Sequence, residues 1–539
     1  MRVRSGRALL LALAALAVGA ASAQASPLTA TSPVQVSGTN PFAGCPASST
    51  QGGTSFLNSE VEPWVTVNPT DADDDDILGD NIVGYYQQDR WSNGGSKGLV
   101  AAVSFDDGVT WTQTFPDQLT VCTDGPDALF ERASDPWISF SPNGSLHAIS
   151  LVLDPDPTTG GFGDNGVVYN RSTDGGLTWE DPIVLRTDFD PNYLNDKESI
   201  TADPNDSDFV YAVWDRVHDA SRAQHAQDNP IGLGFKGPIW FSRTTDGGDT
   251  WEPARKIYET GANKQTLGNQ IVVRPQGQVF DFFGDIVNRS RRRGGIGPIL
   301  ISYIVSNDRG ATWSQPASID DQLPMSLFRA SSTIDPEFDQ NCPELDSDGN
   351  CPIRSGDFIP EVAVNRSNGN LYAVWMDSRF GTGGTPFGSG IFQHDSIAYS
   401  QSTNGGQSWS SPIKVNLTPE NVPVDDQQAF TPSVEVADDG TVTVTYYDFR
   451  NNTPDPEVLA TNYWANHCHP ATEDCSDPGS WDEETGIAGP FDITLAPFAR
   501  GWFLGDYMGM ASDGNDLGSL FGSTNGNGPS SIFFSRLGP

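Results

Sequence analysis

Basic residues are scarce in this sequence. It contains 30 Lys and Arg against 70 Asp and Glu, so its formal net charge is −40 at pH 7. A surface this acidic repels phosphate backbones, which disfavours a nucleic-acid partner. The sequence also lacks a glycine-rich phosphate loop between a strand and a helix, and it lacks a G-x-S-x-G elbow in a strand–turn–helix context. Nucleotide chemistry and the serine-hydrolase elbow are therefore not expected.

Patterns that bind transition metals are also missing. The six His are scattered and no Cys-x-x-Cys pair occurs, so we expect no zinc site and no required cofactor. A structural calcium ion is one open alternative, because Asp346 and Asp348 offer hard oxygen ligands in an acidic loop. That loop lacks the complete EF-hand pattern, and a second acidic run at 71–76 is typical of a solvated loop.

Long apolar runs are absent except near the N-terminus. Residues 8–20 form a short apolar segment that follows three arginines and precedes Ala21-Ser22-Ala23, a small-residue cleavage site. We therefore predict a signal peptide over 1–23, with cleavage near Ala23 and a secreted or periplasmic mature chain. The segment is short for a membrane span and no later run is long enough, so no membrane insertion is expected; a retained N-terminal anchor is the alternative.

Cysteines are few, and six of them fit an oxidising compartment. Two pairs are close in sequence, Cys342 with Cys351 and Cys468 with Cys475, which leaves Cys45 with Cys122. Six cysteines allow 15 connectivities, so this pairing is a hypothesis from proximity alone.

Long helical patterns are absent, and one octapeptide recurs instead. Its pattern is Ser/Thr-x-Asp-x-Gly-x-Thr/Ser-Trp, with Asn replacing Asp in the last copy, and its five copies occupy 104–111, 172–179, 244–251, 306–313 and 402–409. The Asp can accept N–H bonds of a turn, the Gly can adopt positive φ, and the Trp can return to the core. Each copy lies between apolar runs, so we predict a hairpin turn with a structural rather than catalytic Asp.

A weaker motif precedes each of these turns and occurs seven times, as in EPWVTVNP at 62–69 and DPWISFSP at 135–142. Each unit then holds about four strands, which predicts an all-β chain folded as a β-propeller of four-stranded antiparallel blades. Seven blades are expected, with six as the alternative, and a stack or two separate domains is a competing arrangement. The domains are then the signal peptide, an N-terminal segment over 24–57 whose strand at 31–38 closes the ring, and the propeller over 58–539.

The octapeptides resemble the Asp-box repeats of the sialidase-like superfamily. The resemblance covers most of the mature chain and implies a propeller fold. Sialidases of that superfamily have six blades, three arginines that hold the substrate carboxylate, a Tyr nucleophile assisted by Glu, and an Asp acid/base. Their Phe/Tyr-Arg-Ile-Pro motif is absent here and seven units are counted, so no catalytic residue is assigned by motif.

Polar residues gather where first strands begin and where second strands end, two places that share one face of a propeller. The catalytic candidates there are carboxyls and one tyrosine: Glu198, Asp196, Asp357, Asp506 and Tyr507. Carboxyl pairs can serve as acid and base or as acid and nucleophile, and a Tyr can replace a carboxylate nucleophile. The substrate-binding candidates are cations that could clamp a carboxylate or sulfate: Arg90, Arg132, Lys197, Arg216, Arg379, Arg450 and Arg500.

Four second strands end in Asp-Arg or Asp-x-Arg, and ion pairs between blades are an equally weighted interpretation of that repeat. We expect an exported, monomeric, sialidase-like glycoside hydrolase acting on an anionic carbohydrate. A non-catalytic carbohydrate- or protein-binding propeller and a polysaccharide lyase are the alternatives, because fold alone does not define activity.

Overall fold

The computed structural model describes residues 28–45, 52–70, 81–124, 128–156, 162–218, 236–288, 296–320, 353–356, 359–381, 394–453, 458–526 and 529–538. The predicted signal peptide, the Cys342–Cys351 pair, the calcium candidates Asp346 and Asp348, and Asp357 lie outside these residues. Across the described residues the prediction of an all-β chain with antiparallel sheets is confirmed.

Most strands fall into successive antiparallel groups. The first two groups are β3 (Glu60–Val67), β4 (Asn81–Arg90), β5 (Ser96–Phe105) and β6 (Thr112–Thr114), then β7 (Arg132–Phe140), β8 (Leu146–Pro155), β9 (Phe162–Ser172) and β10 (Ile183–Asp188). The next two are β11 (Tyr193–Ala202), β12 (Val210–His218), β14 (Ile239–Thr244) and β15 (Arg255–Tyr258), then β16 (Lys264–Val273), β17 (Val279–Asn288), β18 (Ile296–Ser306) and β19 (Ala317–Ser318).

The later groups repeat this order. They are β21 (Glu361–Val364), β22 (Leu371–Asp377), β23 (Ser396–Ser402) and β24 (Ile413–Lys414), then β25 (Ala429–Val436), β26 (Val442–Asp448), β27 (Ala460–Cys468) and β28 (Glu484–Asp492), then β30 (Gly509–Asp513), β31 (Asp516–Ser523) and β32 (Ser531–Gly538). Short elements connect them: β13 (Lys236–Gly237), β20 (Ile353–Arg354), β29 (Trp502–Phe503), α1 (Val121–Asp124), η4 (Ser378–Phe380), η5 (Val424–Gln427), η6 (Pro478–Ser480) and η7 (Ile493–Leu495).

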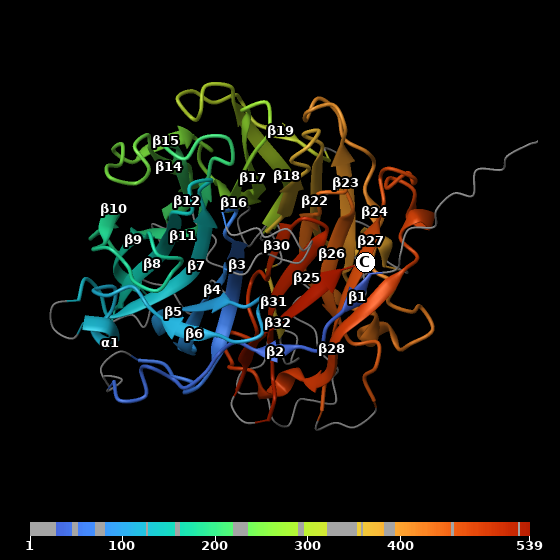
Figure 1. The fold of residues 1–539 in the computed structure, drawn as a ribbon, viewed down its shortest axis with the longest axis horizontal. Coiled ribbons are helices and arrows are strands. Elements are labelled where there is room, and N and C mark those ends of the chain that lie inside the picture. The colour runs from blue at the N-terminus through green and yellow to red at the C-terminus, as the bar shows by residue number, and fades with distance from the viewer. Residues whose placement is uncertain are drawn as a thin grey trace, which may run out of the picture.

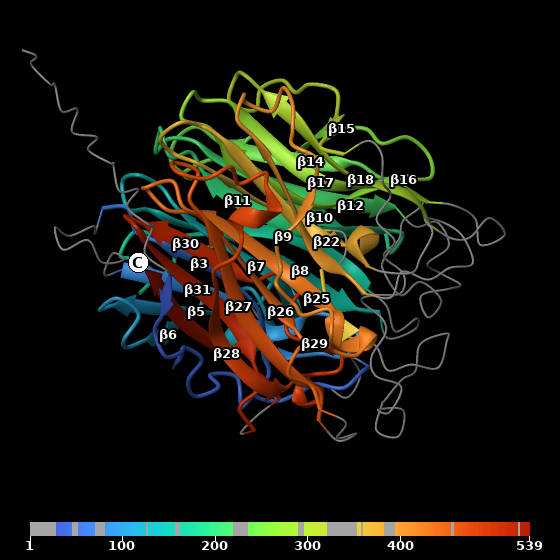
Figure 2. The same cartoon turned by 90° about the vertical axis from the view of Figure 1, so that its right-hand side faces the viewer.

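The first strands of consecutive groups contact one another in a closed order. That order is β3, β7, β11, β16, β21, β25 and β30, and β30 in turn contacts β3. Figure 1 shows the groups following one another around the molecule in chain order, and the view turned by 90° shows β30 and β31 beside β3 (Figure 2). The first and last groups are therefore neighbours in space.

The N-terminal segment joins the last sheet. Strands β1 (Thr29–Ala30) and β2 (Val34–Gln35) pair antiparallel with β32, and the blue β1 lies among the red and orange C-terminal strands in Figure 1. A disulfide between Cys45 and Cys122, the pair that the sequence analysis left over, links this segment to the residues that follow β6. The predicted Cys468–Cys475 disulfide is also present.

The hydrophobic core is divided into clusters between adjacent groups. One cluster joins Val83 and Leu99 of the first group to Ile138 and Ala148 of the second, and further clusters lie between later neighbours. Each group therefore buries one sheet face against the preceding group and the other against the following group. Within the described residues, no helix is long and apolar enough to cross a membrane.

Each octapeptide forms a turn between the third and the outer strand of its group, as predicted. In the second copy, Asp174 accepts bonds from the Thr178 backbone N–H at 2.9 Å, from the Thr178 hydroxyl at 2.6 Å and from the Ser172 hydroxyl at 2.9 Å. Gly176, at φ 95°, donates its N–H to the Ser172 hydroxyl. In the last copy Asn404 accepts from the Ser408 N–H and donates to its hydroxyl. The Asp side chains thus stabilise the turns by accepting hydrogen bonds within them.

We expect Asp174→Ala to lower the free energy of unfolding by about 2 kcal/mol, because it removes the acceptor of three hydrogen bonds. Asp174→Asn should cost under about 1 kcal/mol, since Asn404 builds the same turn in this chain. Denaturant-induced unfolding of the two variants measures the difference. Equal losses would contradict this role for the side chain.

Candidate functional site

The centre of the candidate site lies at β-bulges in the first strands of the groups. The pairing register shifts in β3, β7, β11, β16 and β25, and at each shift one residue has a left-handed backbone. These residues are Glu62, Asp135, Lys197, Gly268 and Thr431, with φ between 47° and 70°. A bulge re-aims a side chain, and a left-handed non-glycine residue costs about 1–3 kcal/mol. Strain repeated at one level of the fold is a mark of a functional centre.

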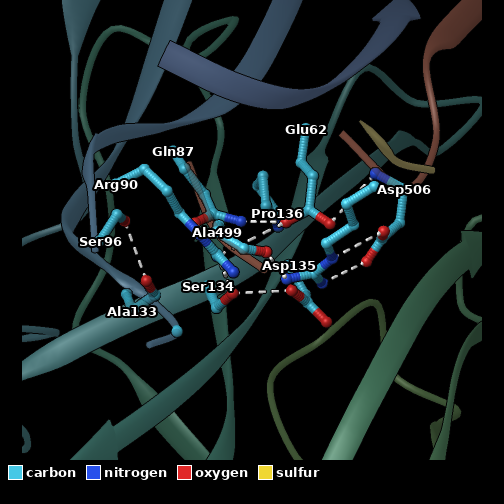
Figure 3. A network of polar contacts seen from close by, with 12 residues as sticks. Glu62, Gln87, Arg90, Ser96, Ala133, Ser134, Asp135, Pro136, Ala499 and Asp506 are labelled. Carbon is cyan, nitrogen blue, oxygen red and sulfur yellow. Dashed lines mark hydrogen bonds and ion pairs between the residues drawn. The ribbon is translucent and has the colours of Figure 1, made fainter. Parts of the chain in front are cut away.

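Lys197 occupies that centre. Its ammonium nitrogen lies 2.7 Å from Asp506 Oδ2, 3.2 Å from Glu62 Oε1 and 3.3 Å from Asp135 Oδ2. The three carboxyls come from the first, second and last groups, and Lys197 comes from the third. Figure 3 shows Glu62, Asp135 and Asp506 converging on one region. One buried cation therefore joins both ends of the ring of first strands.

Two arginines extend this cluster. Arg354, on β20, donates two bonds to Asp506, at 3.2 Å and 2.7 Å, and Arg90 lies 4.0 Å from Glu62 Oε2. Arg90 also donates to Gln87 and Ser134, and both guanidinium groups lie over the Phe503 ring. Arg354 is held there because β20 pairs in parallel with β29.

The carboxyls of the cluster differ in protonation. Burial raises the pKa of Glu62 to about 8, although Lys197 opposes this, and burial likewise raises the pKa of Asp196 to about 6. Burial also acts on Asp135 and Asp506. At Asp135 it is outweighed by Lys197, a hydrogen bond from Ser134 and Arg90 together, and at Asp506 by Arg354 and Lys197 together, so both pKa values lie below the usual range. Protonated and ionised carboxyls therefore coexist near neutral pH.

A small hollow with a volume of about 10 Å³, enough for about one water molecule, adjoins the cluster. Glu198 lines it and is only 2% exposed, and within the described part of the chain neither of its carboxyl oxygens has a hydrogen-bond partner. Burial, followed by the charge of Asp135, raises the pKa of Glu198 well above its ordinary value. Glu198 therefore lies at the wall of the hollow in surroundings that favour the protonated form of its carboxyl.

Tyr507 also lines the hollow, but its hydroxyl is engaged. It donates to the Pro136 carbonyl at 3.1 Å, and its ring packs against Trp64 and Trp137, which stack on each other at 3.4 Å. Burial and the neighbouring carboxyls raise the pKa of Tyr507 well above its ordinary value. A phenolate at this position is strongly disfavoured.

The other predicted cations lie away from this cluster. Arg216 pairs with Asp188, Arg379 with Asp377 and Asp320, and Arg450 with Asp448 and Glu484. Asp188 and Asp320 end or follow the outer strand of the preceding group, so the Arg216 and Arg379 pairs link consecutive groups, which is the alternative that the sequence left open. Arg450 instead pairs within its own group. Arg132 donates to Asn93 and the Gly94 carbonyl and lies over the Trp91 ring, and Arg500 is exposed.

The structure thus brings together Lys197, Asp196, Glu198, Asp506, Tyr507 and Arg90 of the predicted residues. It adds three that were not selected, Glu62, Asp135 and Arg354. The repeated Glu/Asp-Pro-Trp triplets marked the first two, whereas no local pattern marks Arg354. Among the residues that the structure describes, no group of three or more His, Cys, Asp and Glu side chains is arranged to hold a metal ion.

No family model matches this chain, and no curated protein sequence matches it. Among solved structures, a protein of unknown function from Dyadobacter fermentans aligns at 13% identity with a TM-score of 0.45, over 90% of this chain and 98% of that one. The Hadza microbial sialidase Hz136 aligns at 15% identity with a TM-score of 0.43, over 87% and 74%. The GH93 α-L-arabinofuranosidase of Fusarium graminearum aligns at 12% identity with a TM-score of 0.41, over 75% and 92%.

Sialidases and arabinofuranosidases are therefore among the solved structures similar to this chain. Because the identities are below 25% and the TM-scores below 0.5, no activity and no residue role is carried from them to this protein.

We expect the two acids beside Lys197 to respond differently to neutralisation. Near pH 6, Glu62→Gln should change the free energy of unfolding by under about 1 kcal/mol, because Glu62 is already protonated there. Asp506→Asn should cost about 3–5 kcal/mol, because it leaves Arg354 without its carboxylate partner and Lys197 with Asp135 as its one ionised contact among the three carboxyls. Denaturant titrations of both variants test this, and a larger loss for Glu62→Gln would contradict it.

The same groups predict a pH dependence of stability. The pKa of Glu62 is higher in the folded chain, about 8, than its ordinary value of 4.5, so its contribution is complete below pH 4.5 and is lost as pH rises toward 8. Glu60 and Asp215, each with a pKa raised to about 7 by burial, act in the same direction. The midpoint of denaturant-induced unfolding should therefore decrease as the pH rises from 5 to 8, and it should decrease less steeply in Glu62→Gln. A flat profile in the unmodified chain would contradict these protonation states.

Proposed function

We propose that the chain is an exported β-propeller with seven four-stranded blades, closed by the N-terminal strands. Support comes from the cyclic contacts of the seven first strands and from the pairing of β1 and β2 with β32. Export of the mature chain after residues 1–23 is supported by the two disulfides among the described cysteines. On this proposal residues 24–57 tie the ring and residues 58–539 form it, as a monomer.

We further propose that the protein is a glycoside hydrolase. The observation that carries this is the protonated Glu198 carboxyl, which faces a hollow beside ionised carboxylates and Asp196, whose pKa is about 6. Hydrolysis of a glycosidic bond needs one carboxyl that donates a proton to the leaving oxygen and one that acts as base or nucleophile. Groups whose surroundings push their pKa values apart suit these two roles.

On this proposal Glu198 protonates the glycosidic oxygen, and Asp196 takes the proton of the attacking water or attacks the sugar carbon itself. The transition state carries positive charge on the sugar ring. Asp135 and Asp506 are ionised but paired with Lys197 and Arg354, so the carboxylate that would face this charge is Asp196. Lys197 holds both carboxylates in position and keeps their pKa values low.

Two features of the predicted sialidase-like chemistry, a Tyr nucleophile and an anionic substrate, have less support than the pair of carboxyls. A Tyr nucleophile, or the Tyr base of a lyase, needs an accessible hydroxyl with an accessible pKa, whereas the Tyr507 hydroxyl is bound to Pro136. An anionic substrate needs cations that are free to bind it. Arg216, Arg379 and Arg450 are each ion-paired within the fold.

A non-catalytic binding propeller is the second candidate. It is favoured by the mutual neutralisation of Lys197, Asp135 and Asp506 in a cluster that is almost fully buried. Such a cluster stabilises a ring without any chemistry, and binding would then use the same face.

We expect Glu198→Gln to lower kcat on a cleaved glycan by about 10²–10⁴, because the amide cannot donate an acidic proton. In the unmodified protein kcat/KM should rise as pH increases through about 6, where Asp196 ionises. Glu180→Gln, at a half-exposed position on the edge of the fold, is the matched control and should keep full activity. Reducing-end assays on neutral, carboxylated and sialylated glycans provide the measurement. Full turnover by Glu198→Gln would remove Glu198 from the mechanism, and tight glycan binding without product would favour the binding propeller.

A further inference from the structure

Five cations gather where the second, third and fourth strand groups meet. The chain has only 30 Lys and Arg against 70 Asp and Glu, so a local excess of cations stands out against the acidic remainder. Strands β12, β14, β15 and β16 lie together in the green part of Figure 1. We call this gathering the basic surface, and its members are Arg186 of β10, Arg216 of β12, Lys236 of β13, Lys256 of β15 and Lys264 of β16.

Strand pairing places the lysines of the basic surface beside one another. Lys236 lies opposite Lys264 in the parallel pairing of β13 with β16. Lys236 also shares a carboxylate with Lys256, because Glu259 contacts the first ammonium at 2.7 Å and the second at 2.5 Å. Like charges opposite each other on paired strands destabilise a sheet. The fold therefore retains a local repulsion, which is a mark of function rather than of stability.

Two arginines continue the basic surface. Arg186 and Arg216 both contact Asp188 Oδ1, at 3.0 Å and 2.5 Å, and both guanidinium groups lie over the Trp240 ring. Trp240 is the register partner of Lys256 in the antiparallel pairing of β14 with β15. Register partners project from the same face of a sheet, so the arginines and the lysines lie on one continuous surface.

The basic surface has fewer carboxylates than cations. In the described part of the chain, its five cations form ion pairs with three carboxylates, Asp188, Glu259 and Asp285. Glu259 is 45% exposed, and the two lysines that share it, Lys236 and Lys256, are 37% and 44% exposed. Exposed ion pairs contribute little to stability. An anion from solution can therefore replace Glu259 on these lysines with little loss of stability.

The basic surface adjoins the candidate functional site. Asn195 is the register partner of Arg216 and donates to Asp188 at 3.1 Å. The next two residues of the chain are Asp196 and Lys197, which belong to the central cluster. A polymer that extends along this end of the third group would therefore reach both the basic surface and the carboxyls of the site.

The net charge of −40 permits local binding of anions. At physiological ionic strength, exposed charges are screened beyond about 8 Å, so the nearest side chains govern what binds. Carboxylate and sulfate groups bind Lys and Arg through charge-assisted hydrogen bonds. A polymer that carries such groups on successive units can contact several members of the basic surface at once, which increases its affinity.

We propose that the basic surface binds the carboxylate or sulfate groups of an acidic polysaccharide. This assignment rests on the hydrolase proposed above and names its substrate class. Lys236 and Lys256 exchange Glu259 for an anionic group of the polymer, whereas Arg186 and Arg216 stay on Asp188. The surface lies outside the reacting carboxyls, so it binds the polymer beside the bond that is cleaved.

Titration calorimetry of the full mature chain with dextran, dextran sulfate and polygalacturonate tests this directly. We expect at least one of the two acidic polymers to bind about tenfold or more tightly than dextran, and which one binds distinguishes sulfate from carboxylate recognition. This binding should weaken as sodium chloride is raised from about 0.05 M to about 0.5 M. Acidic polymers that bind no better than dextran would overturn the proposal. A DNA oligonucleotide that binds as tightly as they do would overturn the assignment to a polysaccharide.

Charge variants at exposed positions give opposite expected effects. The double variant Lys236→Gln, Lys256→Gln should bind the acidic polymer about tenfold more weakly, because it removes two contacts. Glu259→Gln should bind it about threefold more tightly, because it removes the competing carboxylate. Arg309→Gln is the matched control and should stay within about twofold, since Arg309 is an exposed, ion-paired cation beyond the other end of β18. Weaker binding by Glu259→Gln would contradict the exchange. Far-ultraviolet circular dichroism checks that each variant is folded.

The outcomes separate this inference from the hydrolase proposal. Preferential binding of an acidic polymer without turnover of any glycan supports the basic surface and contradicts the hydrolase. Turnover of a neutral glycan without preference for acidic polymers supports the hydrolase and overturns the basic surface. Where an acidic glycan is cleaved, the double lysine variant should raise KM more than it lowers kcat, because its side chains lie outside the reacting carboxyls. A loss confined to kcat would overturn the docking role.

Discussion

The architecture depends on one buried ammonium group. Lys197 contacts Glu62, Asp135 and Asp506, and through Asp506 it is connected to Arg354. These residues come from the beginning, the middle and the end of the chain, so the cluster holds together strands that are up to 444 positions apart. Removing one member of a buried ion-pair network leaves the others as uncompensated charges, which is the most costly change such a fold can undergo. The same interaction sets the pKa values on which the proposed chemistry rests.

The geometry of that interaction comes from strained backbone. Glu62, Asp135 and Lys197 each adopt a left-handed conformation at a bulge in a first strand. The strain is tolerated because the cores between neighbouring groups fix the strands on both sides of each bulge. The packing between neighbouring groups therefore stabilises the strained backbone at the bulges. These bulges in turn bring carboxyls in two protonation states together. Buried oxygens of Glu198, Asn269 and Glu361 that lack a hydrogen-bond partner among the described residues lie beside them.

Much of the fold could be predicted from the sequence because it is encoded locally. The five octapeptides carry their own turn hydrogen bonds, and the Cys468–Cys475 disulfide, paired correctly by proximity, helped to leave Cys45 for Cys122. The site was predicted in part, since Lys197, Glu198 and Asp506 were expected where first strands begin; the structure places the first two at a bulge inside β11 and Asp506 just before β30. What the sequence could not supply was long-range pairing. Arg354 reaches Asp506 only because β20 lies beside β29, and Arg216 binds Asp188 rather than the adjacent Asp215.

A double-mutant cycle on Lys197 and Asp506 tests the central role of this cluster most directly. The free energies of unfolding of Lys197→Met, Asp506→Asn and the double variant would be measured against the unmodified chain. The structure predicts a coupling energy of about 1–3 kcal/mol, with the double variant less destabilised than the sum of the single variants, because each single change deprives a buried charge of one of its partners. Additive losses would contradict the account, since Lys197 and Asp506 would then stabilise the fold independently.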